Sequence, residues 1–373
     1  MIPSSTRLSI VHLLAPAPFG GLESVVRALA RGQLERGDRV HVMTVLSPPG
    51  DDHPFVESLS EAGVPVIAQV IPGRGYRRER AAVRDVLRST GAEILHTHGY
   101  RPDVLDAPVA REMGVATVST VHGFTGGGWK NRVYEWLQRR AYRKFDRVVA
   151  VSGKLGAELE ACGVPRERIE VVRNAWAVDQ PQVERATARQ VLGIPPHEPV
   201  VGWIGRMSQE KAPDVMVRGL AQVRTAGLRL SMVGDGALRA DVGRLAESMG
   251  VEHRIRWHGV VEDAGKFLRA FDAVVITSWT EGTPILLLEA MAAGVPLITT
   301  AVGGIPDVVT GEEAILVHPG DAEAIAHGID YTLSNHLESS ARAKAALARL
   351  GRDLAVQPWV QRYRDIYSSI LKT

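Results

Sequence analysis

The chain has 373 residues, 45% of them hydrophobic. This length is too great for a single ordinary hydrophobic core and suits two domains of similar size. Its formal net charge of only +2 gives no whole-molecule field of the kind that draws a protein to nucleic acid. The single cysteine, Cys162, excludes an intramolecular disulfide or a multi-thiolate metal site, and no window reaches the roughly 18 apolar residues of a membrane span.

Short apolar runs alternate with helical patterns through the first half of the chain. The polar residues 1–6 lead directly into the first run without the features of a secretory signal, so we expect a soluble, cytoplasmic protein. The strand-like runs lie at residues 8–14, 39–46, 64–70, 92–98, 116–121, 147–152 and 169–173. This alternation predicts a doubly wound parallel sheet with helices on its faces.

A glycine pair follows the first predicted strand. Gly20 and Gly21 precede Glu23 and a helical pattern, and adjacent glycines let the backbone approach a phosphate or a sugar closely. Taken alone, such a pair between a strand and a helix is more often an ordinary turn.

Three histidines lie at the ends of two predicted strands. His96 and His98 alternate along one strand and share one face, and His122 follows the next strand. A zinc site is one interpretation, although no acid or further ligand stands at metal spacing. For His96 the alternative is a core or capping role.

Cations and aromatic residues are interleaved over residues 130–154. On a helix, Arg132, Arg139 and Arg143 fall near one line. The apolar positions that mark another face are Val133, Trp136, Leu137 and Ala141. A basic face rimmed with aromatics predicts peripheral contact with an anionic membrane, the alternative being a solvated helix whose apolar side packs in the core. A second basic patch comprises Arg74, Arg77, Arg78, Arg80 and Arg84.

The texture of the sequence changes at residues 179–199. Prolines cluster there around a short helical piece, which predicts an interdomain connection. A second series of strand-like runs follows at residues 200–205, 228–234, 255–259, 273–277, 296–300 and 314–317. The tail carries Trp359, Tyr363 and Tyr367 at helical spacing, and one interpretation is an ordinary packing helix of the second domain.

The loop after the strand at residues 200–205 holds Arg206 and Lys211. Ligands of open α/β sheets bind at this carboxyl end, and the two cations can meet a diphosphate from two sides. Their charge would stabilise a departing nucleoside diphosphate without a metal ion. The alternative is a solvated basic loop.

The sequence GDG at residues 234–236 invites a dinucleotide-binding interpretation. Arg239 stands where the third glycine of that motif belongs. We therefore expect a strand-to-helix turn next to the nucleotide instead.

Two acids bracket a predicted helix start in the segment EGTPILLLE, from Glu281 to Glu289. Thr283 and Pro284 are a typical N-cap and first-turn pair, and the first N–H groups of this helix can hold a phosphate. Glu289 is the one acid of a nearly apolar helix, so it needs a hydrogen-bond donor, and a ribose diol would serve. Glu281 can accept from sugar hydroxyls. The alternative is a solvated loop acid and a salt-bridged core acid.

Glu281, Glu289 and the following AMAAGVP with its strand resemble the carboxyl-terminal signature of the retaining glycosyltransferases of family 4, and the resemblance covers nearly the whole chain. It implies the α/β GT-B fold, with two doubly wound, parallel-sheet Rossmann-like domains that face each other across a cleft. It divides the chain into an acceptor-side domain at residues 1–178, a connection at 179–199, a nucleotide-sugar-binding domain at 200–355, and a C-terminal helix at 356–373 that packs back on the first domain.

The resemblance also implies roles for individual residues. Arg206 and Lys211 would act on the diphosphate, Glu289 on the ribose, and Glu281 and His122 on the donor sugar. The catalytic group would then be Arg206, Lys211, Glu281 and His122, with His98 lining the acceptor side. The backbone close to the donor would be that of Gly21, Gly205, Gly282, Thr283, Pro284 and Ile285. Ala212 and Pro213 stand where relatives usually have a glycine after the lysine.

The predicted function is transfer of a sugar from a nucleotide-sugar donor to an acceptor hydroxyl, with retention of the anomeric configuration, in glycan, glycolipid or glycoconjugate synthesis. UDP is preferred over GDP or ADP, and neither a metal nor another cofactor is expected. The alternatives are an inverting enzyme or epimerase of GT-B type, a transferase for a soluble small molecule, and a non-catalytic nucleotide-sugar-binding regulator. The sugar, the acceptor and the oligomeric state are set by loop shapes that no motif reveals.

Overall fold

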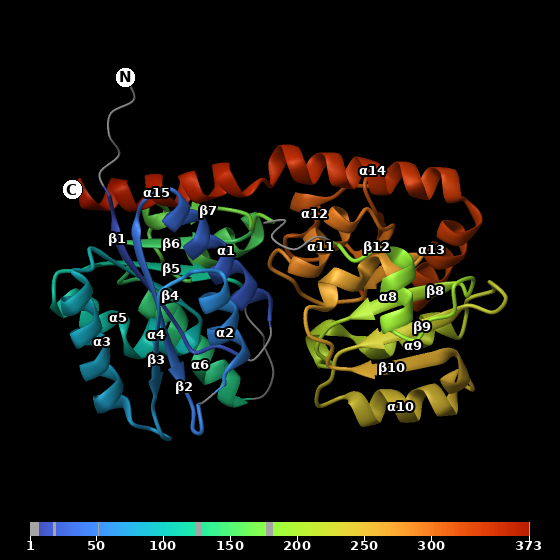
Figure 1. The fold of residues 1–373 in the computed structure, drawn as a ribbon, viewed down its shortest axis with the longest axis horizontal. Coiled ribbons are helices and arrows are strands. Elements are labelled where there is room, and N and C mark those ends of the chain that lie inside the picture. Colours follow the sequence, from blue (N-terminus) through green and yellow to red (C-terminus); the bar gives the residue numbers. More distant parts are fainter. Residues whose placement is uncertain (1–6, 18–19, 51, 124–128, 177–181, 373) are drawn as a thin grey trace. The chain divides into compact units, whose positions relative to one another are not determined.

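The computed structural model describes residues 7–17, 20–50, 52–123, 129–176 and 182–372. The chain divides into two compact units, unit 1 with Met1–Ala175 and Val356–Thr373, and unit 2 with Trp176–Ala355. Each unit is built on one parallel sheet (Figure 1). Every predicted strand position is occupied by a strand whose ends shift by at most two residues. Residues 18–19, which directly precede the glycine pair, and the side chains of Trp129 and Lys130 lie outside the described residues.

The sheet of unit 1 has seven strands in the order β3-β2-β1-β4-β5-β6-β7. They are β1 (Ser9–Leu14), β2 (Arg39–Leu46), β3 (Val66–Val70), β4 (Ile94–His98), β5 (Ala116–Val121), β6 (Arg147–Ala150) and β7 (Ile169–Val171). The order reverses where β1 pairs with both β2 and β4. Open sheets of this kind bind ligands at the carboxyl ends of the strands beside such a reversal.

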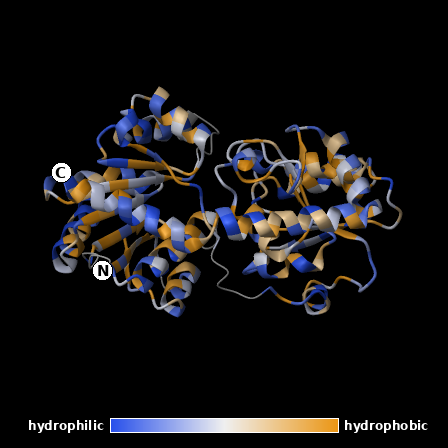
Figure 2. Cartoon of the chain, turned by 90° about the horizontal axis from the view of Figure 1, so that it is seen from above, coloured by the Kyte–Doolittle hydropathy of each residue, from blue (hydrophilic) through white to orange (hydrophobic). Residues whose placement is uncertain are grey.

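Helices cover both faces of this sheet, which explains why its central strands are buried on both sides. The helices are α1 (Gly21–Glu35), α2 (Pro54–Glu61), α3 (Tyr76–Thr90), α4 (Tyr100–Leu105), α5 (Ala107–Glu112), α6 (Trp129–Tyr142) and α7 (Gly153–Ala161). Val11 and Leu13 of β1 pack in a core with residues of α3 and α5. His12, which points the other way from the same strand, contacts α1. Figure 2 shows the hydrophobic colouring concentrated on the strands and alternating with hydrophilic colouring along the helices.

The helix α15 (Val356–Leu371) belongs to unit 1, although almost the whole of unit 2 precedes it in the sequence (Figure 1). It packs closely on Gly32 of α1, which has no side chain. A Cβ at this position would collide with Val360. Arg364 forms a buried ion pair with Asp38, its Nη2 donating to Oδ1 at 3.0 Å. Tyr363 and Tyr367 are fully buried beneath it. A helix over this tail that packs on the first domain is what the family resemblance implies.

The sheet of unit 2 has six strands in the order β10-β9-β8-β11-β12-β13. They are β8 (Val200–Ile204), β9 (Arg229–Val233), β10 (Ile255–Gly259), β11 (Ala273–Ile276), β12 (Leu297–Thr300) and β13 (Ile315–Val317). Its α-helices are α8 (Arg185–Val191), α9 (Pro213–Leu220), α10 (Arg239–Ser248), α11 (Ile285–Ala293), α12 (Ile305–Val308), α13 (Ala322–Ser334) and α14 (His336–Asp353). The strand order reverses at β8, which pairs with both β9 and β11.

The segment at residues 179–199, predicted as the interdomain connection, is described from residue 182. Where it is described, it belongs to unit 2, and Ala188 of α8 and Leu192 lie in the core of that unit. The buried Arg189 holds it there by donating to the carbonyls of Ala270 and Pro195 at 2.9 and 2.8 Å. Prolines therefore mark a turn-rich segment that packs on the second sheet, since its short helix has an apolar side to bury.

Candidate functional site

The predicted diphosphate residues of unit 2 gather at the reversal point of its sheet. Arg206 and Lys211 follow β8, and Glu281 follows the adjacent β11. Lys211 Nζ lies 2.6 Å from Glu281 Oε1, and Ser278 donates to the same oxygen at 2.6 Å. An ammonium group has three N–H donors, so this pair leaves donors for a phosphate oxygen. The sequence placed both residues near the donor but did not predict that they form an ion pair.

A buried threonine fixes the loop that carries Lys211. Thr277 Oγ1 lies 2.9 Å from the carbonyl oxygens of both Lys211 and Ala212, and it accepts from Trp203 Nε1 at 2.9 Å. Trp203 belongs to β8 and Thr277 directly follows β11. The two central strands of the sheet therefore hold the backbone of Lys211 in place through one hydroxyl group.

Ala212 explains why a glycine is usual after this lysine. Its backbone has φ 47° and ψ 55°, in the left-handed region, and the residue is fully buried. An L-residue with a side chain pays roughly 1–2 kcal/mol for this conformation, whereas glycine adopts it freely. Pro213 then occupies the first turn of α9, where its missing N–H is harmless. The departure from the family pattern thus preserves the left-handed backbone path.

Arg206 lies on an exposed part of the same loop. Among the residues that the structure describes, none is within hydrogen-bonding distance of its guanidinium group. The loop is packed against the GDG turn, where a Cβ at Gly234 or at Gly236 would collide with the carbonyl of Gly205 or Met207. These glycines serve close contact between two strand-end loops, as the interpretation of a strand-to-helix turn expects.

The helix α11 begins one residue later than predicted. Its N-cap is Pro284, with φ −68° and ψ 130°, rather than Thr283, because Pro284 is extended and Ile285 is the first helical residue. The first-turn N–H groups at Ile285 and Leu286 lack intrahelical acceptors, as at any helix start. Thr283 is buried, and Gly294 ends the helix with a left-handed φ of 67°.

Two glycines shape the surroundings of the two acids. A Cβ at Gly303 would overlap the backbone of Glu281, and Gly304 donates to the Gly282 carbonyl at 2.8 Å. A Cβ at Gly265 would collide with the carboxylate of Glu289, which is half-buried. The loop after β12 and the 3-10 helix η4 (Ala264–Ala270) therefore fix Glu281 and Glu289 respectively.

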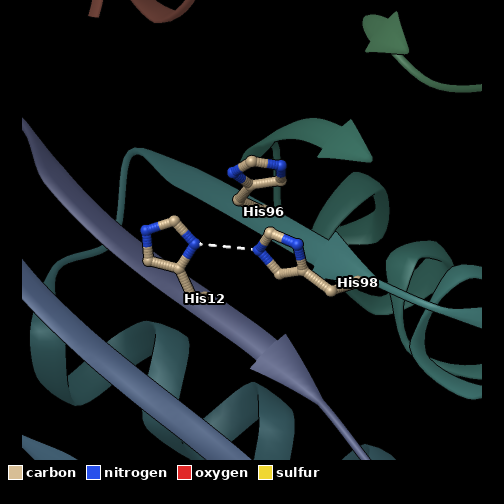
Figure 3. Close-up of side chains that lie close together, drawn as sticks. All are labelled: His12, His96 and His98. Carbon is tan, nitrogen blue, oxygen red and sulfur yellow. Dashed lines mark hydrogen bonds between the residues drawn. The ribbon is translucent and has the colours of Figure 1, made fainter. Parts of the chain in front are cut away.

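In unit 1, four histidines form a continuous hydrogen-bonded cluster at the reversal point of the first sheet. His12 Nδ1 lies 3.0 Å from His98 Nε2, and His98 Nδ1 lies 3.4 Å from His122 Nε2 (Figure 3 shows the first of these contacts). His12 Nε2 contacts Gln33 Oε1 at 2.8 Å. His96 contacts Tyr367 OH at 2.7 Å through Nδ1 and Thr120 Oγ1 at 2.8 Å through Nε2.

Burial keeps these imidazoles neutral. It lowers the pKa of His12 and of His122 to about 4, and it holds the pKa values of His96 and His98 well below the ordinary value. Neighbouring imidazoles of the cluster lower the pKa values of His96 and His98 further. At neutral pH each of the four rings therefore carries one N–H donor and one acceptor nitrogen.

The zinc interpretation named His96, His98 and His122, whereas the structure groups His12 with His96 and His98. One nitrogen of each of these three lies within 4.8 Å of the others, which is close enough for a shared metal ion. The geometry fits hydrogen bonding better. The His96 and His98 rings are tilted against each other, with centroids 4.2 Å apart and an interplanar angle of 36°, and both nitrogens of each ring contact a protein group.

His98 was expected to line the acceptor side. Its side chain is 2% exposed and both of its ring nitrogens are engaged, so it reaches the surface only through His122. Sequence reasoning missed His12 and Gln33. The available signal was a lone histidine in the otherwise apolar central strand SIVHLL, since an unpartnered buried imidazole is unfavourable.

The glycine loop after β1 is organised by Glu23. The carboxylate of this buried acid accepts from the Ala17 N–H at 2.8 Å, and a Cβ at Gly20 would collide with it. Gly21 is the first residue of α1 and is exposed. Glu23, the acid that follows the glycine pair, thus has a structural role, and the backbone of Gly21 stays open to a ligand.

The helix α6 is held on unit 1 through Gln138 and Tyr142, and its apolar stripe is only partly buried. Gln138 donates to the buried Asp103 at 2.7 Å, and Tyr142 is fully buried. Val133 and Trp136, which the alternative of a solvated helix put on a core-facing side, are 46% and 59% exposed, and Tyr134 is 47% exposed. Leu137 is half-buried and Ala141 packs against the core beside Tyr142, so Val133 and Trp136 form the part of the apolar stripe that faces solvent.

Comparisons with known proteins match both halves of the chain. The model described as Glycosyltransferase Family 4 matches residues 19–180, and the model described as Glycosyl transferases group 1 matches residues 198–335. The N-acetyl-alpha-D-glucosaminyl L-malate synthase of Bacillus anthracis is 28% identical over 77% of this chain and 77% of its own length. A lipopolysaccharide core biosynthesis glycosyltransferase of Rhizobium meliloti is 28% identical over 76% of this chain and 84% of its own.

Solved structures match the whole fold. The crystal structure of HepE of Anabaena in complex with UDP and glucose has a TM-score of 0.83 at 21% identity, covering 97% of this chain and 100% of that one. WaaG, a glycosyltransferase involved in lipopolysaccharide biosynthesis, has a TM-score of 0.74 at 20% identity, covering 96% and 99%. The predicted architecture of two parallel α/β units is confirmed.

Proposed function

This chain belongs to the family 4 glycosyltransferases of GT-B fold, and from that premise we propose that it transfers a sugar from a UDP-linked donor to an acceptor hydroxyl with retention of anomeric configuration. The observation that carries the proposal is the Lys211–Glu281 pair at the reversal point of the second sheet, next to the amino end of α11. A cation for a diphosphate and an acceptor for sugar hydroxyls stand 2.6 Å apart there.

The proposed roles follow from the charges and positions of the residues. Arg206 and Lys211 stabilise the charge that develops on the departing diphosphate, together with the N–H groups at the start of α11. Glu281 accepts from a hydroxyl of the sugar, and Glu289 accepts from the ribose. The family resemblance gives His122 a role at the donor sugar. No metal ion has a part in this scheme because the two side-chain cations supply the positive charge.

The identity of the base rests on likeness to other proteins. HepE of Anabaena was crystallised with UDP, with UDP and glucose, and with UDP-glucose. The relatives carry different acceptors in their names, among them malate in the Bacillus anthracis synthase and inositol phosphate in the Mycobacterium enzymes. We therefore propose UDP as the leaving group and leave the acceptor open.

The test is a reaction of the purified protein with UDP-sugars, monitored by proton NMR through the signal of the anomeric proton. We expect slow hydrolysis of one UDP-sugar without an acceptor, with an α-linked donor giving first the α-configured free sugar. First release of the β-anomer would show inversion. Isomerisation of the donor would show an epimerase, and binding without turnover of any nucleotide sugar would contradict the proposal altogether.

We further propose that α6 contacts an anionic membrane surface. Val133, Trp136 and Arg140 recur at helical spacing on α6 and are all exposed, so apolar and basic side chains share one accessible face, and the exposed Lys144 follows the end of the helix. The Arg140 guanidinium lies 6.0 Å from the centre of the Trp136 ring. Such a surface fits the interface of an anionic bilayer, where each cation contributes about 1 kcal/mol. None of the helices in the described part of the chain has the length and hydrophobicity for crossing a bilayer.

Cosedimentation with liposomes checks this surface. We expect binding to vesicles with anionic lipids, weaker at physiological than at low salt, and no binding to neutral vesicles. Replacement of Arg132, Arg140 and Lys144 by glutamate should abolish it. The control replaces exposed Arg218, Arg244 and Arg352 of unit 2 by glutamate, which changes the net charge equally. Equal loss in both variants, or no binding by the wild type, would refute a contact through α6.

A further inference from the structure

The histidine cluster of unit 1 forms one unbranched chain of hydrogen bonds. From the exposed end inward, it runs through His122, His98, His12, Gln33, Tyr367, His96 and Thr120. All members except His122, which is half-buried, are at most 2% exposed. The chain joins β1, α1, β4, β5 and α15, so it uses most of the elements around the reversal point of the sheet.

One group decides which way every hydrogen bond in the chain points. Gln33 Oε1 can only accept, so His12 Nε2, 2.8 Å away, carries the proton. The neutral His12 ring then has an acceptor at Nδ1, and His98 must donate to it from Nε2 at 3.0 Å. By the same rule His98 Nδ1 accepts, and His122 donates to it from Nε2 at 3.4 Å.

The other arm of the chain obeys the same rule. Gln33 Nε2 donates to Tyr367 OH at 3.2 Å, which leaves the Tyr367 proton to donate to His96 Nδ1 at 2.7 Å. His96 Nε2 then donates to Thr120 Oγ1 at 2.8 Å. All four histidines therefore share the tautomer with the proton on Nε2.

We propose that the Gln33 amide sets the tautomer of His122 through His12 and His98, so that His122 presents an unprotonated Nδ1 as a hydrogen-bond acceptor for the ligand. This inference rests on the proposed function only in naming the ligand as a hydroxyl of the donor sugar. Gln33, His12 and His98 are in this sense positioning residues, since they act on the sugar through His122.

The same geometry makes the chain a two-state element. Rotation of the Gln33 amide by half a turn would exchange its donor and acceptor and would require every histidine to carry its proton on Nδ1 instead. A mixture within one molecule would bring two donors or two acceptors face to face in a buried site, which is costly. The four tautomers are therefore coupled and change only together.

Histidine nitrogen NMR on the unliganded full-length protein tests the coupling directly. Long-range proton–nitrogen spectra of protein with ¹⁵N-labelled histidine distinguish protonated from unprotonated ring nitrogens, and single replacements of the four histidines assign the signals. We expect Nε2–H with unprotonated Nδ1 in His12, His96, His98 and His122 at neutral pH. Different tautomers among the four, a doubly protonated ring, or bound zinc found by elemental analysis would overturn the proposal.

Two substitutions interrupt the chain of hydrogen bonds at defined points. Gln33→Leu should release all four histidines into mixtures of tautomers, because Tyr367 also loses the donor that directs its proton to His96. Tyr367→Phe removes a single oxygen atom, so it should fold, and it should release His96 alone from the fixed tautomer. The matched control is Gln138→Leu, which removes another buried amide of unit 1 that bonds to Asp103 outside the chain. Unchanged tautomers in Tyr367→Phe, or loss of the fixed tautomers in the control, would contradict the proposal.

A titration with UDP-glucose separates this inference from the proposed function. Loss of the fixed acceptor in Gln33→Leu should raise KM for the donor sugar by about fivefold to tenfold, the effect of one hydrogen bond, while affinity for UDP stays unchanged. Failure of the wild type to bind any UDP-sugar would refute the function and leave the tautomers as measured. Normal donor kinetics in Gln33→Leu with released tautomers would refute the role of His122 Nδ1 at the sugar.

Discussion

Replacement of Lys211 or of Arg206 by alanine is expected to lower kcat by about a hundredfold or more, the usual effect of removing one preorganised electrostatic contact in a transition state. The affinity for the neutral sugar portion of the donor should change far less, because the diphosphate gains charge only as the sugar leaves. Steady-state kinetics with the active UDP-sugar, identified by the NMR assay, gives both quantities. Lys211→Ala has a second effect, because it removes the ion-pair partner of the nearly buried Glu281 carboxylate. Ser278 then still donates a hydrogen bond to that carboxylate.

The control is Arg244→Ala, which removes an exposed cation of the same unit that pairs with Asp241 on the surface of α10. Exposed pairs of this kind contribute little, so activity and stability should stay near the wild-type values. Near-normal kcat in either Arg206→Ala or Lys211→Ala would refute the assignment of these residues to the diphosphate. Circular dichroism of each variant separates lost chemistry from lost folding.

UDP is expected to stabilise the protein without any added metal ion. At a UDP concentration of about 100 times its Kd, mass action raises the free energy of unfolding of the binding unit by roughly 2.7 kcal/mol. The physical reason is that Arg206, Lys211 and the amino end of α11 supply the positive potential that a divalent cation supplies elsewhere. Thermal unfolding with UDP, GDP and ADP, each with EDTA or with magnesium, measures the effect.

EDTA should leave the UDP-induced shift unchanged, and Lys211→Ala should reduce it. Uridine, which lacks the phosphates, is the matched ligand control and should give a much smaller shift. A strict requirement for magnesium or manganese would contradict the argument from the side-chain cations. A larger shift with GDP or ADP than with UDP would keep the phosphate site and correct the base.

The positions and number of the strands could be predicted from the sequence because buried parallel strands are short apolar runs with turns between them. How residues 179–199 pack was harder to predict. Prolines and polar residues indicated a connection, yet the few apolar side chains of α8 suffice to bury it on the second sheet. Similarly, α6 has apolar residues at the spacing of a core-facing helix, but it packs through Gln138, Ala141 and Tyr142, and Val133 and Trp136 stay exposed. Periodicity reveals an apolar stripe and not which side a helix packs through.

For the candidate site, the sequence indicated which residues to consider, but it did not predict the contacts between their side chains. Lys211 and Glu281 could be placed at the carboxyl end of the second sheet because each follows a predicted strand, but their ion pair depends on which strands are neighbours. The family resemblance pointed to His122, while His12 and Gln33 entered only with the structure. Contacts between strands and helices far apart in sequence need a register, and no local pattern encodes one.

The position of α15 bears on how the protein is made. Unit 2 is one continuous stretch of chain, whereas unit 1 contains residues on both sides of it. During synthesis, unit 2 can therefore complete its fold while unit 1 still lacks the helix that carries Tyr363, Arg364 and Tyr367. Until residues 356–371 leave the ribosome, Asp38 and His96 have no partner from that helix. Although domains usually fold in the order of their synthesis, the part of this protein that begins first must finish last.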